Sequence, residues 1–128
     1  MKKLKGIDGK LDDAWSELVK LQWNMRCARC RKAEYLNSHH IFSRSARSVR
    51  WDTDNGICLC AGCHNLSSSF SAHKTPTEFT YWLEGLKGRE WIEALSKKAS
   101  NTVKFYKSDK EDMLKSMRDE IALLKEFD

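Results

Sequence analysis

The strongest constraint in this sequence is a pair of Cys-x-x-Cys motifs, Cys27–Cys30 and Cys60–Cys63. Each motif can present two thiolates from one tight turn to a tetrahedrally coordinated ion. A redox-active motif would need a thioredoxin-like βαβ setting, which the sequence lacks, and unrelated buried cysteines would not repeat the spacing. We therefore predict that Cys27, Cys30, Cys60 and Cys63 bind one structural zinc ion. Four thiolates fill the coordination sphere, so this ion should stabilise the fold and not catalyse.

Length and cysteine usage agree with a fold stabilised by metal. The chain has 128 residues, 41% of them hydrophobic, which is enough for one domain with a thin core. The first residues lack the apolar segment of a signal peptide, and no apolar run reaches the roughly 18 residues that a membrane span needs. We therefore expect a cytoplasmic protein with no membrane partner, whose thiols stay reduced and bind metal. Cys58 lies outside both motifs and is predicted to be a buried core residue.

Hydrophobic periodicity predicts a helix followed by a short segment that contains strands. Apolar residues recur at helical spacing over residues 11–21, which predicts an amphipathic helix ending before Cys27. After Cys27 the helical period is lost. Residues 35–41 and 56–59 are candidate strands, and a polar loop over residues 42–55 joins them.

The C-terminal part of the sequence is predicted to be helical. Thr75–Glu78 is a capping box with proline at the first helical position, and Gly85 and Gly88 interrupt the apolar stripe that follows. A second capping box, Ser108 with Glu111, precedes a final apolar stripe, which could pack on the chain's own helices or form the surface for a homodimer or another protein. The chain is thus predicted to be one α+β domain over residues 1–128, divided into an N-terminal helix (1–26), a zinc-knuckle core (27–72) and a helical extension (73–128).

Polar residues with catalytic potential lie between and beside the cysteine motifs. They are the adjacent pair His39 and His40, then Asn55, and His64 directly after the last zinc-binding cysteine. Hydrolysis of a phosphodiester needs a base to activate water, a cation for the developing charge and a group that orients the base. One histidine of the pair could be the base and the other, with His64, could hold a divalent metal, but residue chemistry alone does not assign the roles. Adjacent strand residues point to opposite faces, so we expect a twist or bulge there. His73 stands apart and is predicted to be a surface or capping residue.

Basic residues are concentrated in the first half of the sequence. The net charge is +5, and the excess of Lys and Arg lies within residues 1–64. Arg44, Arg47 and Arg50 alternate with serines in the loop before Asn55, and we predict that they contact DNA phosphates. The alternative is that some arginines only balance the negative charge of the zinc–thiolate site.

The order and spacing of these residues resemble the zinc-containing HNH endonucleases. The matching elements are Cys27-x-x-Cys30, His39-His40, Asn55 and Cys60-x-x-Cys63-His64. The segment HHIFSRSARSVRWDTDN further resembles NinG-like phage recombination proteins and related phage HNH proteins. The resemblance implies that the zinc-stapled core is a ββα-metal fold.

The resemblance also implies a role for each polar residue. His40 would be the general base, His39 and His64 would bind a catalytic divalent metal, and Asn55 would orient the site. Many members have aspartate at the position of His39. A neutral imidazole there lowers the negative charge of the site, so Ni²⁺ and Zn²⁺ become candidate metals beside Mg²⁺ and Mn²⁺.

The resemblance therefore implies an endonuclease. The expected activity is hydrolysis of DNA phosphodiester bonds, by nicking or by structure-directed cutting of the phage recombination or processing type, leaving 5′-phosphate and 3′-hydroxyl ends. A phage-encoded protein of this kind would act in the host cytoplasm. The alternatives are a non-catalytic zinc-knuckle DNA-binding module and a subunit of a larger phage packaging or recombination complex.

Overall fold

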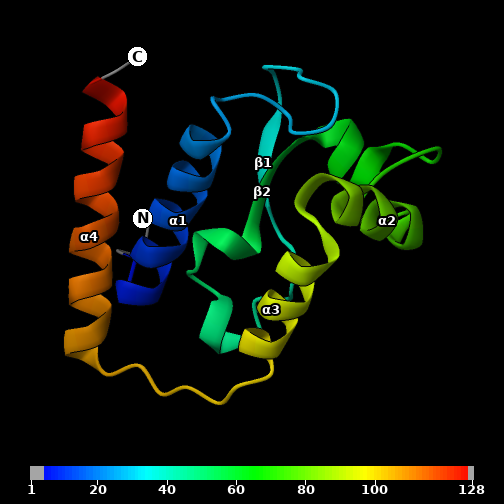
Figure 1. Cartoon of the computed structure of the whole chain (residues 1–128). Helices are drawn as coiled ribbons and strands as arrows, with labels where there is room; N and C mark the ends of the chain where they lie inside the picture. The colour runs from blue at the N-terminus through cyan, green and yellow to red at the C-terminus, as the bar shows by residue number, and fades with distance from the viewer. Residues whose placement is uncertain (1–4, 127–128) are drawn as a thin grey trace.

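A two-stranded antiparallel hairpin has the first and last helices of the chain on one side and the two helices between them on the other (Figure 1). The computed structural model describes residues 5–126, so residues 1–4 and 127–128 of the predicted terminal regions lie outside the described residues. The elements are α1 (Ile7–Gln22), β1 (Leu36–His40), β2 (Gly56–Cys60), α2 (Pro76–Lys87), α3 (Arg89–Ala99) and α4 (Lys107–Glu126). This mixture of helices with one small sheet confirms the predicted α+β class. Within residues 5–126, every helix is too short or too polar to cross a membrane.

The hairpin forms close to the predicted strands. Its register pairs Leu36 with Cys60 and His40 with Gly56. Tyr35 has a left-handed backbone (φ 55°), so the first strand begins one residue later than predicted. All five residues of β1 pair in unbroken register, so the bulge expected at the histidine pair does not occur within this strand.

Asn55 closes the long loop between the strands. Its side chain is fully buried, and its Oδ1 accepts a hydrogen bond from the backbone N–H of Phe42 at 2.7 Å. Its Nδ2 donates to the carbonyls of Phe42, at 2.9 Å, and Val49, at 3.1 Å. The amide therefore holds both ends of the loop to its middle, in addition to the backbone bond from the N–H of Ile41 to the carbonyl of Asn55.

Helices α1 and α4 run side by side along one flank of the hairpin (Figure 1). Buried Trp15 and Leu18 of α1 belong to the same apolar cluster as Leu114, Met117 and Ile121 of α4. The final apolar stripe of the sequence is thus covered within the chain, which is the first of the two predicted alternatives for it.

Neither predicted capping box forms. The Thr75 hydroxyl accepts from the backbone N–H of Ser71 and donates to its carbonyl, so it is not available to the first turn of α2. Ser108 lies inside α4, one residue after its start. Asp109 serves this end of the helix instead, because its Oδ2 accepts from the backbone N–H of Tyr106 at 2.8 Å.

Only one of the two glycines predicted to interrupt the helices does so. Gly85 lies within α2, whereas Gly88 separates α2 from α3 with φ 91°. A left-handed backbone is readily available only to glycine, which explains why the chain turns at Gly88.

Gly56 allows α1 to approach the hairpin closely. A Cβ atom at this position would lie 2.7 Å from Cζ2 of Trp15 and still closer to Val19. Real Cβ atoms do not come so near, so a side chain here would push α1 away from the strand end that carries His40.

We predict that Gly56→Ala destabilises the protein by about 1–3 kcal/mol through overpacking against α1. Gly85→Ala is the matched control, because an added Cβ there meets nothing within 4 Å and the position is helical. It should raise stability by about 0.5–1 kcal/mol. Denaturant unfolding of the zinc-loaded proteins measures both changes; equal stability of Gly56→Ala and the parent would contradict the close packing.

Candidate functional site

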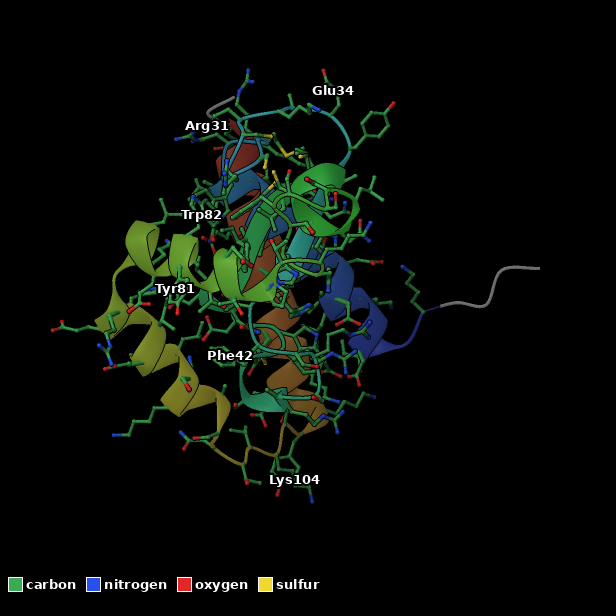
Figure 2. The ribbon with its side chains drawn as sticks, turned by 90° about the vertical axis from the view of Figure 1, so that its right-hand side faces the viewer. Arg31, Glu34, Phe42, Tyr81, Trp82 and Lys104 are labelled. Atoms are coloured by element: carbon green, nitrogen blue, oxygen red, sulfur yellow. The ribbon has the colours of Figure 1, made fainter. Side chains whose placement is uncertain are left out.

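The four predicted zinc ligands come together at one end of the hairpin. The sulfur atoms of Cys27, Cys30, Cys60 and Cys63 all lie within 4.8 Å of one another, and the Cys30 and Cys60 sulfurs are 3.5 Å apart. Figure 2 shows sulfur atoms gathered below the loop that carries Arg31 and Glu34. A tetrahedral zinc ion with Zn–S bonds of about 2.3 Å requires sulfurs about 3.8 Å apart. The cluster therefore fits a structural zinc site.

Backbone hydrogen bonds shape both cysteine turns. In the first turn, the N–H of Cys27 donates to the carbonyl of Lys32 at 2.8 Å, and the N–H of Ala28 donates to the carbonyl of Cys58 in β2. In the second turn, the N–H of Cys63 points at the Cys60 sulfur, 3.5 Å away. The bond from Ala28 to Cys58 ties the first motif to the strand that leads into the second motif.

The same backbone donors favour a thiolate at Cys27. Burial acts to raise the pKa of this thiol, but N–H groups of Cys30, Cys60 and Arg29 outweigh it and lower the pKa to about 7. Burial and the neighbouring Cys27 thiolate raise the pKa of Cys63. The Cys27 thiol thus deprotonates easily whereas the Cys63 thiol resists deprotonation, and a divalent cation would favour the thiolate form of the ligands by neutralising their charge.

Cys58 lies outside the cluster, as predicted. It is fully buried, and burial raises the pKa of its thiol to about 11. It is a core residue of β2.

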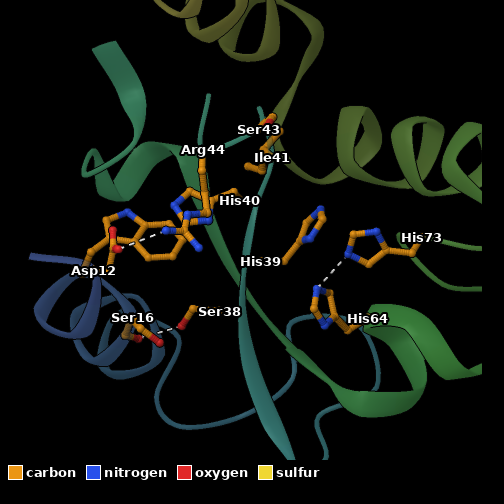
Figure 3. Close-up of a pocket in the computed structure, with 11 residues that line it drawn as sticks. Asp12, Ser16, Ser38, His39, His40, Ile41, Ser43, Arg44, His64 and His73 are labelled. Atoms are coloured by element: carbon orange, nitrogen blue, oxygen red, sulfur yellow. Dashed lines mark hydrogen bonds and ion pairs between the residues drawn. The ribbon is translucent and has the colours of Figure 1, made fainter. Parts of the chain in front are cut away.

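A second cluster of possible metal ligands contains three histidines (Figure 3). Ring nitrogens of His39, His64 and His73 lie within 4.8 Å of one another. The Nε2 atoms of His64 and His73 are 3.0 Å apart. Nitrogens bound to one ion at about 2.1 Å lie about 3.0–3.4 Å from each other, so the three rings can share a cation with small adjustments. Three protein ligands leave coordination positions open for water or substrate.

His73 is the site residue that the sequence did not reveal. Its ring is exposed, as predicted for a surface residue, but it also faces His39, with ring centroids 5.1 Å apart. Backbone bonds from His73 N to His64 O and from Ala72 N to Cys63 O lay this segment along the turn Gly62–Leu66. No residue spacing signals that pairing, because it is set by a non-helical loop folding back on the zinc turn.

His40 lies on the other side of β1 from these three rings (Figure 3). Its ring stacks on Trp15 of α1 with centroids 3.8 Å apart and planes 8° from parallel. Its Nε2 is 2.9 Å from the carbonyl oxygen of Arg50. A carbonyl only accepts hydrogen bonds, so Nε2 carries the proton and Nδ1 keeps a free lone pair.

One cavity of about 590 Å³ connects the two sides. His39, His40, His64 and His73 all line it, together with Arg44 and other residues. The strand thus presents both members of the histidine pair to the same cavity without a bulge, because residues from both faces of β1 line it.

Burial lowers the pKa of His39, His40 and His64 and so favours their neutral forms. Desolvation, followed by the charges that His64 and His73 would carry, lowers the pKa of His39 to about 3. Burial also lowers the pKa of His64 and of His40; for His40, the bond to the Arg50 carbonyl opposes the shift. Neutral rings have the lone pair that a metal ion or a proton needs.

The three arginines of the loop differ in their availability. Arg50 makes a bidentate ion pair with Asp12 of α1 at 3.1 and 2.8 Å, and its side chain is only 15% exposed. Arg44 reaches the same carboxylate with one bond of 3.2 Å and remains 62% exposed. Arg47 lies 3.8 Å from Asp8 and is similarly exposed. Arg50 is therefore committed to α1, whereas Arg44 borders the cavity with most of its guanidinium in solvent.

Comparison with known protein families agrees with this geometry. Residues 27–70 match the family model of HNH endonucleases. No curated protein and no solved structure matches the chain. The HNH match supports a nuclease-type activity and implies a nucleic acid substrate. It contains both cysteine motifs, His39, His40, Asn55 and His64.

The HNH segment does not contain the whole site. His73 lies three residues beyond its end, and all of α1, with Trp15 and Asp12, precedes its start. The chain therefore completes the HNH segment with residues from both flanking regions.

We predict that Cys60→Ser abolishes stoichiometric zinc binding and unfolds the chain, whereas Cys58→Ala keeps both. The two cysteines belong to the same strand, but only Cys60 is in the cluster. Structural zinc contributes about 10–16 kcal/mol in small zinc-dependent folds, which is comparable to the whole stability of a domain. Metal content and the thiolate charge-transfer absorption of the Co²⁺-substituted proteins measure the difference. Loss of metal in both variants would place Cys58 among the ligands.

Proposed function

We propose that this protein is a metal-dependent HNH endonuclease that hydrolyses DNA phosphodiester bonds. The observation that carries the proposal is that the adjacent residues His39 and His40 lie on opposite sides of β1 and line the same cavity. The Nδ1 atom of His40 is free to accept a proton, and it borders the same cavity as a three-imidazole cluster able to hold a cation.

The protein's own groups supply most of the reaction's requirements. His40 takes a proton from water at Nδ1 and becomes an imidazolium, whose Nε2–H still donates to the Arg50 carbonyl. The hydroxide so formed attacks phosphorus as the bond to the 3′ oxygen breaks, and the leaving oxygen takes up a proton. Arg44 binds a non-bridging oxygen of the phosphate, because its guanidinium is exposed at the cavity. Asn55 acts through the backbone: it fixes the loop that carries Arg44 and the Arg50 carbonyl. A divalent cation on the three histidines would supply Lewis acidity for the charge that develops on the phosphate and leaving oxygen. The products are 5′-phosphate and 3′-hydroxyl ends.

The ligand set favours particular metals. Three neutral imidazoles without a carboxylate suit Mn²⁺, Ni²⁺ or Zn²⁺ better than Mg²⁺, which prefers oxygen ligands and its own water shell. We therefore expect cleavage to be supported by Mn²⁺ or Ni²⁺ at lower concentrations than by Mg²⁺.

The biological setting follows from the sequence resemblance to NinG-like phage recombination proteins. It favours a role in phage DNA recombination or processing, in the host cytoplasm. With few groups near the cavity suited to reading base edges, we expect nicking or structure-directed cutting with weak sequence preference.

The central prediction concerns His40. His40→Ala should lower the rate of nicking of supercoiled plasmid in Mn²⁺ by about 10²–10⁴-fold, the usual contribution of a general base. It should retain zinc, fold and metal binding at the three histidines. Lys115→Ala, at an exposed position on α4, is the control and should cut like the parent. Equal cutting by His40→Ala would rule out this base, and DNA binding without cutting by the parent would favour the binding-only module.

A second prediction concerns His73. His73→Ala should weaken Ni²⁺ or Mn²⁺ binding to the zinc-loaded protein, measured by calorimetric titration. Loss of an outer partner of a metal ligand costs about 10–100-fold in affinity, and loss of a direct ligand should cost no less. His40→Ala serves here as the control with unchanged metal affinity. If His73→Ala binds the metal as tightly as the parent, only His39 and His64 are ligands.

A further inference from the structure

Helix α1 forms one wall of the proposed site, although it lies outside the HNH-matched segment 27–70. Trp15 supplies the flat surface on which the His40 ring lies. The Ser16 carbonyl accepts a hydrogen bond of 2.6 Å from the Ser38 hydroxyl, two residues before His40 on β1. The helix thus touches both the strand and the ring that the proposed reaction uses.

Trp15 is held tightly in this position. Its Nε1 donates to the carbonyl of Asp52 at 2.8 Å, and its ring lies over Gly56, the residue paired with His40 across the hairpin. Only glycine leaves room for the ring there, so α1 packs directly against the strand end opposite His40.

Asp12 connects the same helix to the carbonyl that binds His40. Its Oδ1 accepts from Arg50 Nε at 3.1 Å and from Trp51 Nε1 at 2.8 Å, and its Oδ2 accepts from Arg50 Nη2 at 2.8 Å. These bonds anchor two consecutive residues of the loop. The Arg50 carbonyl, which lies between the two anchored side chains, is therefore held at a fixed place, 2.9 Å from His40 Nε2.

We infer that Asp12 is a positioning residue of the site, which acts through the Arg50 carbonyl to fix His40 with a proton on Nε2 and a free lone pair on Nδ1. The inference rests on the proposed function insofar as His40 is the general base. It assigns a role in the site to the N-terminal helix, beyond the HNH segment. Two arginines share the Asp12 carboxylate, so Asp12 also holds positive charge near the cavity without neutralising it fully.

The first test is the tautomer of His40 in the full-length, zinc-loaded protein. Long-range ¹H–¹⁵N spectra at a pH where the ring is neutral distinguish protonated Nε2 from protonated Nδ1, and the signal is assigned by its loss in His40→Gln. We expect one tautomer, with the proton on Nε2. A proton on Nδ1, or a mixture of tautomers, would overturn the inference without any variant of Asp12.

The second test breaks the connection. Asp12→Asn and Arg50→Lys should each give a mixture of His40 tautomers and a single-turnover rate of DNA cleavage lower by about 10–100-fold, as for outer partners of other sites. The affinity of Asp12→Asn for DNA should not weaken, because two arginines lose their carboxylate. The double variant should be no slower than either single variant, because the two residues act as one unit. Asp13→Asn, at the exposed neighbouring position, should match the parent in rate and tautomer.

The outcomes separate this inference from the proposed function. If Asp12→Asn retains zinc and helix content yet keeps a single tautomer and the parent rate, Asp12 has only a structural role. If Asp12→Asn does not fold, Arg50→Lys and the tautomer of the parent decide the question. A parent protein that cuts no DNA, but whose His40 tautomer still depends on Asp12, would support the positioning and refute the nuclease.

Discussion

The structure depends on the meeting of two cysteine turns at one end of a hairpin. Two strands alone are marginally stable in water, and the described residues 5–126 add no third strand to this hairpin. The sulfur cluster closes it where Leu36 pairs with Cys60, and the buried amide of Asn55 closes the loop at the opposite end, where His40 pairs with Gly56. Both ends of the sheet are thus fixed by polar or metal-binding groups, which add to the two clusters of buried apolar side chains.

Features encoded by local spacing were predictable from the sequence. The cysteine motifs, the strands, the buried Cys58 and the helices all follow from short patterns. The strand ends lie within one residue of the prediction, whereas α1 begins at Ile7, four residues before its predicted start. His39 and His64 meet because they directly adjoin elements that the cysteines hold together. His73 was missed because its position depends on a loop that returns to the zinc turn through backbone bonds alone.

The same distinction applies to the capping boxes, which were wrong, and to the arginine loop, whose DNA contacts stay a prediction. A capping box is a local pattern, but the loop brings the Ser71 backbone within reach of Thr75. The Thr75 hydroxyl hydrogen-bonds to this backbone instead of to the first turn of α2. From the sequence, Arg44, Arg47 and Arg50 were all predicted to contact DNA phosphates in the same way. In the folded chain, Asp12 of α1 holds Arg50 in a largely covered ion pair. Arg44 and Arg47 also lie near carboxylates of α1, Asp12 and Asp8, but their side chains stay exposed. The guanidinium of Arg50 helps to hold the pKa of Asp12 below its ordinary value, although burial acts in the opposite direction.

The alternation of side chains along β1 gives the site its geometry. His39 points toward the zinc side of the molecule, where its ring lies 5.4 Å from Phe79 of α2, whereas His40 stacks on Trp15 of α1. Trp15 and Phe79 belong to two different clusters of buried side chains. The proposed metal ligand and the proposed base are therefore held by separate packing units and are joined by one peptide bond. Because covalent geometry fixes the spacing of adjacent residues, a small shift between the two clusters would rotate one ring relative to the other without separating them. The orientation of His40 is then the adjustable quantity of the site, and α1 is the element that sets it.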